Sequence, residues 1–153
     1  MSSNSSDRIE KEIVLKAPRS RVWRAISDSR EFADWFQVRL NEPFVAGKDV
    51  LARFSFRGTE IESTLQVVRV EPETHFAFRW HPYAVEPGVD YSFEPMTLVS
   101  FELSDAPGGT RLRIVESGFD HIPVARRATA FRMNGEGWAA QSRNIEAYLA
   151  KAR

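Results

Sequence analysis

Apolar and polar residues alternate along several segments of the chain, with the period of two that is typical of strands buried on one face. The first segment spans 9–15 and ends before Pro18, where proline favours the first turn of a helix. A hairpin over 99–116 comes last, and Gly58-Thr59 marks a tight turn in the series between them. That series is a three-stranded meander whose inward positions are Val50, Ala52, Phe54, Phe56, Ile61, Ser63, Leu65, Val67, Phe76, Phe78 and Trp80.

A period of three to four predicts helices in three other segments. Val22 and Ile26 fall at helical spacing directly after the first strand. Asp28, with Glu31 three residues later, resembles a capping box and predicts the start of a second short helix. The longest apolar stripe predicts a terminal helix that begins near Pro123 and comprises Phe131, Trp138, Ile145 and Leu149.

The order of these elements predicts an α+β fold. A sheet that is apolar on one face must cover that face, and only the terminal helix is long enough to do so. We therefore expect a helix-grip fold: a curved antiparallel sheet wrapped around a long C-terminal helix, with two short helices after the first strand and an apolar cavity between sheet and helix. Residues 1–7 are expected to be a disordered leader, and residues 8–153 a single helix-grip ligand-binding domain.

The segment 82–95 is interrupted by three prolines and a glycine, which argues against a strand. It also carries Tyr83, Tyr91 and Phe93, which are too apolar for a solvated linker. We expect it to be a loop folded over an opening.

Composition excludes several functional classes. Across 153 residues, 21 basic side chains balance 21 acidic ones, so no net field attracts nucleic acid or anionic lipid. The chain has no cysteine, which excludes disulfides and thiol chemistry and is typical of a reducing compartment. Because it also has no apolar run long enough for a signal peptide or a membrane span, we expect a cytoplasmic protein without nucleic-acid partners.

Candidate catalytic chemistry is sparse. His75, His81 and His121 lack the spacing of a zinc site. Ser117, Asp120 and His121 contain the residue types of a hydrolase, but no nucleophile elbow surrounds the serine. We therefore assign no catalytic residue, no metal ligand and no cofactor.

The inward-facing aromatic residues are the best candidates for a binding site, because apolar walls desolvate a ligand while a few polar groups orient it. About half of them are expected to do no more than fill the core. Glu116 lies on the inner face, where it either orients a polar ligand head or, as a strand-end carboxylate, reaches solvent or pairs across strands. The candidate ligand-binding residues are Trp35, Phe36, Phe54, Phe56, Phe78, Trp80, Phe101, Glu116, Trp138, Gln141 and Ser142.

Two glycines fall inside the predicted terminal helix. Gly135 and Gly137 each cost about 1 kcal/mol relative to alanine in a helix interior. We expect a compensating feature, such as a close backbone approach or a kink over the cavity. On the opposite face of the sheet, Glu102 and Arg113 are predicted to form a solvent-side pair.

Several motifs along the chain occur in a specific order. They are Ile13-Val14-Leu15-Lys16-Ala17-Pro18, Val22-Trp23-Arg24-Ala25, Trp35-Phe36, Thr110-Arg111-Leu112, Ser117-Gly118-Phe119 and Gly137-Trp138. Together they resemble bacterial homologues of the activator of heat-shock-protein ATPase, within the START-like, SRPBCC superfamily, over about residues 9–150. The resemblance implies the helix-grip fold and a cavity, whereas the ligand differs among members that bind lipids, hormones or polyketides. Ser142 departs from it, because the family usually has leucine there.

Three functions remain open. The first is a binding protein that holds a small apolar or amphipathic, lipid-like ligand without a cofactor, in a stress-related role implied by the resemblance. The second is a polyketide-cyclase or hydrolase-like enzyme in which Glu116 or His121 acts as acid or base. The third, a chaperone-associated interaction module, rests on the resemblance alone, and the eukaryotic activator's chaperone-stimulating N-terminal domain has no counterpart here. The lack of an evident acid-base pair favours binding over catalysis.

Overall fold

The computed structural model describes residues 7–151. The leader expected over residues 1–7 lies outside this range except for Asp7, whose carbonyl oxygen accepts hydrogen bonds from the amides of Gly118 and Phe119. In chain order the elements are β1 (Arg8–Leu15), α1 (Arg19–Ser27), α2 (Ser29–Phe36), β2 (Arg39–Leu40), β3 (Asp49–Phe56), β4 (Thr59–Glu71), β5 (His75–Trp80), β6 (Thr97–Ala106), β7 (Gly109–Ser117), the 3₁₀ turn η1 (Phe119–His121) and α3 (Val124–Lys151).

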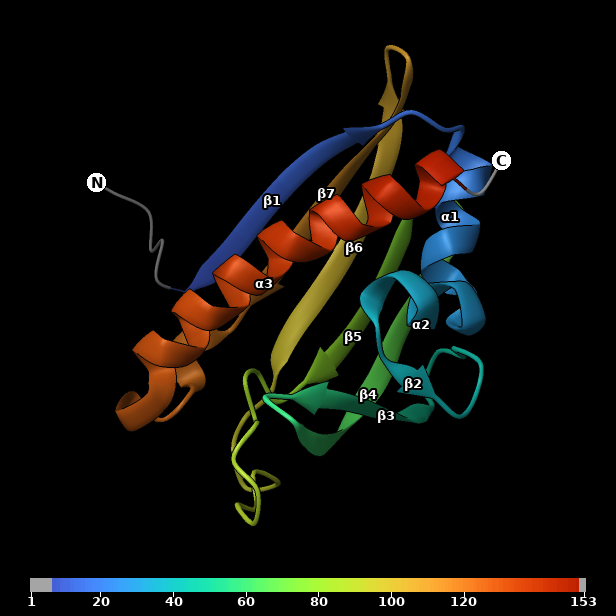
Figure 1. Cartoon of the computed structure of the whole chain (residues 1–153). Helices are drawn as coiled ribbons and strands as arrows, with labels where there is room; N and C mark the ends of the chain where they lie inside the picture. The colour runs from blue at the N-terminus through green and yellow to red at the C-terminus, as the bar shows by residue number, and fades with distance from the viewer. Residues whose placement is uncertain (1–6, 152–153) are drawn as a thin grey trace, which may run out of the picture.

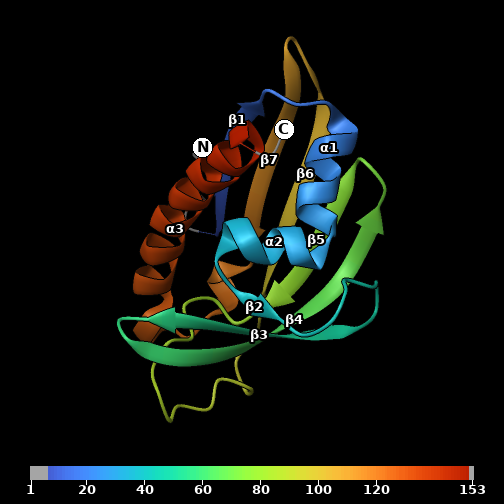
Figure 2. The same ribbon diagram turned by 45° about the vertical axis from the view of Figure 1, so that its right-hand side comes forward.

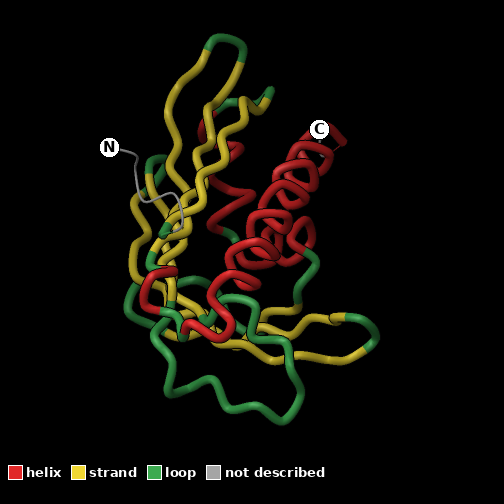
Figure 3. Tube along the Cα trace, turned by 90° about the vertical axis from the view of Figure 1, so that its left-hand side faces the viewer, coloured by secondary structure: helices red, strands yellow, loops and turns green. Residues whose placement is uncertain are grey.

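Within the described residues, seven antiparallel strands form one sheet in the order β1-β7-β6-β5-β4-β3-β2. The helix α3 runs across one face of this sheet (Figure 1), and α1 and α2 lie beside it over the same face (Figure 2). The β3–β4 end of the sheet turns under α3 (Figure 3), and an irregularity in β4 between Val67 and Arg69 accompanies this bend. The predicted α+β helix-grip fold is confirmed.

The core lies between the sheet and the three helices. The stripe predicted on α3 is buried at Trp138, Ile145 and Leu149, while Phe131 is half-buried and contacts Phe119, with ring centroids 5.2 Å apart. Along the described residues, no helix is both long and apolar enough to cross a lipid bilayer.

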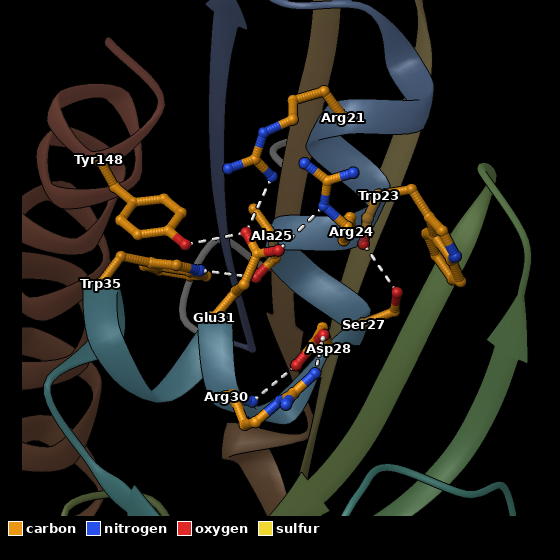
Figure 4. A network of polar contacts seen from close by, with 10 residues as sticks. All are labelled: Arg21, Trp23, Arg24, Ala25, Ser27, Asp28, Arg30, Glu31, Trp35 and Tyr148. Atoms are coloured by element: carbon orange, nitrogen blue, oxygen red, sulfur yellow. Dashed lines mark hydrogen bonds and ion pairs between the residues drawn. The ribbon is translucent and has the colours of Figure 1, made fainter. Parts of the chain in front are cut away.

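A carboxylate on α2 joins the three helices (Figure 4). Glu31 accepts hydrogen bonds from Arg21 (2.8 Å) and Arg24 (3.0 Å) on α1 and from the Tyr148 hydroxyl (2.8 Å) on α3. Burial alone would raise the pKa of Glu31, but the hydrogen bonds from Tyr148 and Arg21 outweigh it and lower that pKa below its ordinary value. The predicted capping box is confirmed only at Asp28, which caps α2 by accepting a hydrogen bond from the Arg30 amide at 2.9 Å. The second residue of the box, Glu31, bonds to the other helices instead.

One turn and one ion pair show how local chemistry compares with the predicted pattern. The β3–β4 turn falls at Arg57-Gly58, one residue before the predicted position, with φ values of 52° and 81°. Two successive positive φ values match the right-handed twist of a hairpin, and Gly58 adopts this conformation without strain. On the outer face of the sheet, Arg113 donates to Glu102 at 2.9 Å, which confirms the predicted solvent-side pair.

Candidate functional site

A pocket of about 490 Å³ lies between the sheet and α3, at the β3–β5 end. The strands β3, β4 and β5 supply one side, and the second half of α2 together with the middle of α3 supplies the other. Segment 81–85, at the start of the loop that follows β5, completes the rim. The sequence pattern predicts a cavity in this place, because the inward faces of the meander and the terminal helix must face one another.

Aromatic side chains form much of the wall. Phe36, Trp80 and Trp138 pack against one another, with ring centroids 5.8 Å apart for Phe36 and Trp138, 5.9 Å for the two indoles and 6.2 Å for Phe36 and Trp80. Trp138 is 2% exposed, while Phe36 and Trp80 are half-buried. Three rings from α2, β5 and α3 therefore meet at one side of the pocket.

Glu116, on β7, lies behind this aromatic wall and is fully buried. Its Oε1 accepts from the Trp138 indole at 2.7 Å and from the Asn134 amide at 2.9 Å. Its Oε2 accepts from the Trp80 indole at 2.8 Å and from the Thr97 hydroxyl at 2.6 Å. The carboxylate thus joins β5, β6, β7 and α3 through four neutral donors.

This donor set matches an anionic carboxylate. The indole N–H groups of Trp80 and Trp138 can only donate, and one of them points at each oxygen of Glu116. Burial of a charge is costly unless hydrogen bonds replace its water, and these four donors do so. Within residues 7–151, no lysine, arginine or histidine forms an ion pair with Glu116, so its negative charge is not neutralised by a neighbouring cation.

Most of the candidate ligand-binding residues line the pocket. Those that do are Phe36, Phe54, Phe56, Phe78, Trp80, Trp138 and Gln141. Gln141 is held in place there by donating from its amide to the Phe36 carbonyl oxygen at 3.1 Å. Its Oε1 accepts from the Asn144 amide at 3.0 Å, so both ends of the Gln141 amide are held at the junction of α2 and α3.

The remaining candidates lie outside the pocket lining. Trp35 is buried and donates its indole N–H to the Ala25 carbonyl oxygen at 2.8 Å, which ties α2 to α1 (Figure 4). Phe101 is fully buried in the sheet behind the aromatic wall, 5.8 Å from Trp138 between ring centroids. Ser142 is half-buried and donates to the Trp138 carbonyl oxygen at 2.9 Å, and Glu116 touches the pocket through its partners rather than directly.

The structure adds residues that the sequence analysis did not single out. Asn134 and Met133 line the pocket from α3, as do Tyr83, Ala84 and Val85 from the loop after β5. Asn134 precedes Trp138 by one helical turn, so its place on the inward stripe was the available signal for it. Thr97 had no such signal, since its role depends on the position of β6 beside β7.

Gly137 borders the pocket, and Gly135 does not. A Cβ atom added at either glycine would meet no heavy atom within 4 Å outside the surrounding helix. The expected close backbone approach is therefore wrong at both positions. Gly137 is exposed and borders the pocket, and a Cβ atom added there would meet open space.

The loop after β5 is held to the start of α3 by one side chain. Arg126 donates to the carbonyl oxygen of Pro82 at 2.8 Å and, through Nε, to Glu94 at 2.8 Å, so it contacts both ends of the loop. Its guanidinium also lies over the Tyr91 ring, 4.8 Å from the centroid. The loop wall of the pocket at Tyr83 is thereby fixed relative to α3.

The residues considered for catalysis or metal binding are not gathered at the pocket. His121 is exposed in η1, and Ser117 at the end of β7 is outside the lining. In the part of the chain that the structure describes, no three histidine or acidic side chains are placed to hold a metal ion. His81 does line the pocket, and its Nε2 lies 3.0 Å from the Glu94 carbonyl oxygen.

Residues 16–150 match the family described as Activator of Hsp90 ATPase homolog 1-like protein. The chain belongs to this family. No curated protein sequence matches the chain. The resemblance seen in the motif order is therefore confirmed at the level of the family.

Solved structures of other proteins show the same fold. A protein from Arthrobacter aurescens superposes with a TM-score of 0.78 at 18% identity, covering 99% of this chain and 90% of that one. The Aha1 dimer from Colwellia psychrerythraea gives 0.67 at 16% identity, covering 91% and 92%. DynU16, a protein of the dynemicin biosynthetic locus, gives 0.72 at 24% identity, covering 96% of this chain and 48% of its own. At these identities the likeness concerns the fold alone.

Proposed function

We propose that the chain is a binding protein that holds a small apolar or amphipathic molecule in the pocket between the sheet and α3. The observation that carries this proposal is the pocket itself. Its volume of about 490 Å³ is typical of small-molecule sites, which usually span roughly 300 to 1,000 Å³. Its wall is mainly apolar and rich in aromatic rings, with polar groups from Asn134 and Gln141 at one side, which suits a ligand with an apolar body and one polar end.

Incomplete burial of the wall supports this proposal over ordinary core packing. Phe54, Phe56 and Tyr83 are all half-buried although they face inward. Side chains that only fill a core reach close packing, which leaves few voids larger than a water molecule. Apolar surface left open in a concave site is instead typical of a place where a ligand binds.

The geometry favours binding over the acid-base alternative. Both oxygens of Glu116 are occupied by donors and the residue is outside the pocket lining, so its carboxylate has no evident path to a substrate. His121 is exposed and is also outside the lining. A general acid or base must come within hydrogen-bond reach of the reacting group, directly or through one water.

The chaperone-associated alternative is supported by the family's description and by the fold shared with the Aha1 dimer of Colwellia psychrerythraea. A stress-related role depends on the same family description, and a cytoplasmic location on the cysteine-free composition. These proposals are more specific than the proposal of a binding pocket. If the pocket binds no small molecule, the chaperone-associated role becomes the leading function.

The test is a titration with the neutral apolar dye N-phenyl-1-naphthylamine, followed by energy transfer from tryptophan. Because Trp80 and Trp138 both line the pocket, saturable binding near one dye per chain should quench their emission and raise that of the dye. Native mass spectrometry of protein purified from its own cells then identifies a co-purified ligand by mass. Dye emission that rises without saturation, together with an unliganded mass, would count against a binding pocket.

A further inference from the structure

The pocket carries an electrostatic preference that its aromatic lining does not reveal. Resting on the binding function proposed above, we propose that this pocket selects ligands with a cationic head over ligands with an anionic head. The cation would lie against the aromatic wall formed by Phe36, Trp80 and Trp138, with the buried Glu116 carboxylate behind it as counter-charge. The ligand class is thus a cationic amphiphile, such as an alkylamine or a quaternary ammonium compound.

The first support is the balance of charged groups around the pocket. Among the described residues, Glu136 is the carboxylate in the lining, where it pairs with Arg132 at 3.8 Å, and no lysine or arginine lines the pocket. Glu116 lies directly behind the wall and is fully buried, and no cation within residues 7–151 forms an ion pair with it. In the described part of the lining, His81 is the one residue able to carry positive charge, and its Nε2 lies 3.0 Å from the Glu94 carbonyl oxygen. Because Arg132 offsets Glu136, the negative potential inside the pocket comes mainly from the buried Glu116.

The second support is that two indole rings link the Glu116 charge to the pocket. Trp80 and Trp138 each donate the edge N–H of the indole to Glu116, at 2.8 and 2.7 Å. An indole carries positive charge at its edge and negative charge on its face, so an anion at the edge strengthens the negative face. Cations bind best over tryptophan faces. Of the two indoles, Trp80 is half-buried and offers the more open face, whereas Trp138 is 2% exposed and acts from behind it.

The third support is burial. Interactions between exposed charges are screened by water and salt, whereas a buried charge is screened much less. Because Glu116 is fully buried, its field acts across protein and ligand rather than across solvent. An anionic head in the same place is repelled by the Glu116 carboxylate. It is also repelled by the electron-rich faces of the aromatic rings.

The experiment compares three probes that share a ten-carbon tail: decyltrimethylammonium, decanol and decanoate, at a pH of about 8 where decanoate is charged. Each competes with N-phenyl-1-naphthylamine on the unmodified protein. We expect the ammonium probe to bind at least about ten-fold more tightly than decanoate, with decanol between them. This preference should persist when sodium chloride is raised to about 0.5 M, because the main counter-charge is buried.

Two variants locate the source of the preference. Glu116→Gln keeps the side-chain shape and removes the charge, so the ammonium-to-decanoate ratio should fall to within about three-fold of unity. Glu102→Gln is the matched control, since it removes one acidic charge from the outer face of the sheet and should leave the ratio unchanged. Glu136→Gln, at the exposed part of the lining, should lower the ratio by about two-fold and only at low salt.

The outcomes separate this inference from the binding function itself. If all three probes displace the dye equally, or decanoate is preferred, charge selection is wrong while the binding pocket stands. A preference that disappears in salt in the unmodified protein overturns the assignment to Glu116, even if the Glu116→Gln protein does not fold. If neither the dye nor any probe binds, the proposed binding function fails.

Discussion

The indole of Trp138 on α3 donates to Oε1 of Glu116 on β7 across 2.7 Å, and this bond joins the terminal helix to the sheet at the pocket wall. The same indole packs against Phe36 and Trp80 and lines the pocket. The Trp138 ring therefore forms part of the apolar pocket wall, while its N–H group donates a hydrogen bond to the buried Glu116 carboxylate.

Substitutions at Trp138 should separate these two contributions. Trp138→Ala removes a buried indole and a donor to Glu116, so unfolding free energy should fall by about 3 to 5 kcal/mol. Trp138→Phe restores most of the ring without the N–H, and the loss should be about 1 to 3 kcal/mol. Denaturant melts measure both. An alanine variant that loses less than about 1 kcal/mol would mean that the helix does not depend on this contact.

Glu31 should make stability depend on pH in acid. Although its burial would raise the pKa, bonds from Tyr148 and Arg21 lower it in the folded state below the ordinary value of 4.5. The unfolded chain therefore binds the proton more readily, and the stability that Glu31 contributes is complete above pH 4.5 and lost as pH falls through the lowered folded-state pKa.

The check is a pair of melts on the unmodified protein and Glu31→Gln, repeated from neutral pH into acid. The variant should be less stable by about 1 kcal/mol at neutral pH, and the difference should shrink below pH 4.5. Glu62→Gln is a suitable control, because its pair with Arg53 is exposed at 2.9 Å and is expected to contribute little. A difference for Glu31 that grows toward acid would contradict the assignment.

Arg126 should determine how firmly the loop after β5 closes the pocket rim. Arg126→Ala removes its bonds to Pro82 and Glu94, so amide hydrogen exchange across residues 82–95 should accelerate by at least about ten-fold. Arg143→Ala on the same helix is the control, since Arg143 is exposed. Unchanged exchange in the loop would mean that other contacts hold it.

The fold was predictable because its elements carry strong periods. Phe76, Phe78 and Trp80 alternate on one face of β5, and the α3 stripe repeats over four turns and more. β2 has only two residues, which is too short for any period to show, and it forms because it pairs with β3. The β3–β4 turn lies one residue before its predicted position, because Arg57 has a positive φ. Arginine is not a residue type that indicates a positive φ in a sequence.

The site was less predictable, because facing a core and facing a cavity have the same sequence pattern. Trp35 and Phe36 are neighbours on α2, yet one bonds to the Ala25 carbonyl in the core and the other lines the pocket. The donors around Glu116 come from elements that meet only in the folded chain. Neither the Thr97 hydroxyl nor the space beside Gly137 follows from local propensity.

The most direct test of the binding pocket is a dye titration on two glycine variants of the same helix. Gly137→Leu places a side chain in open space beside the pocket, and Gly135→Leu places the same side chain outside the lining. Both should raise unfolding free energy by about 0.5 to 1 kcal/mol, because glycine is unfavourable in a helix interior. Affinity for N-phenyl-1-naphthylamine should fall at least about ten-fold in Gly137→Leu alone, since blocked volume costs apolar contact. Equal dye affinity in both folded variants would contradict the claim that the ligand binds between the sheet and α3.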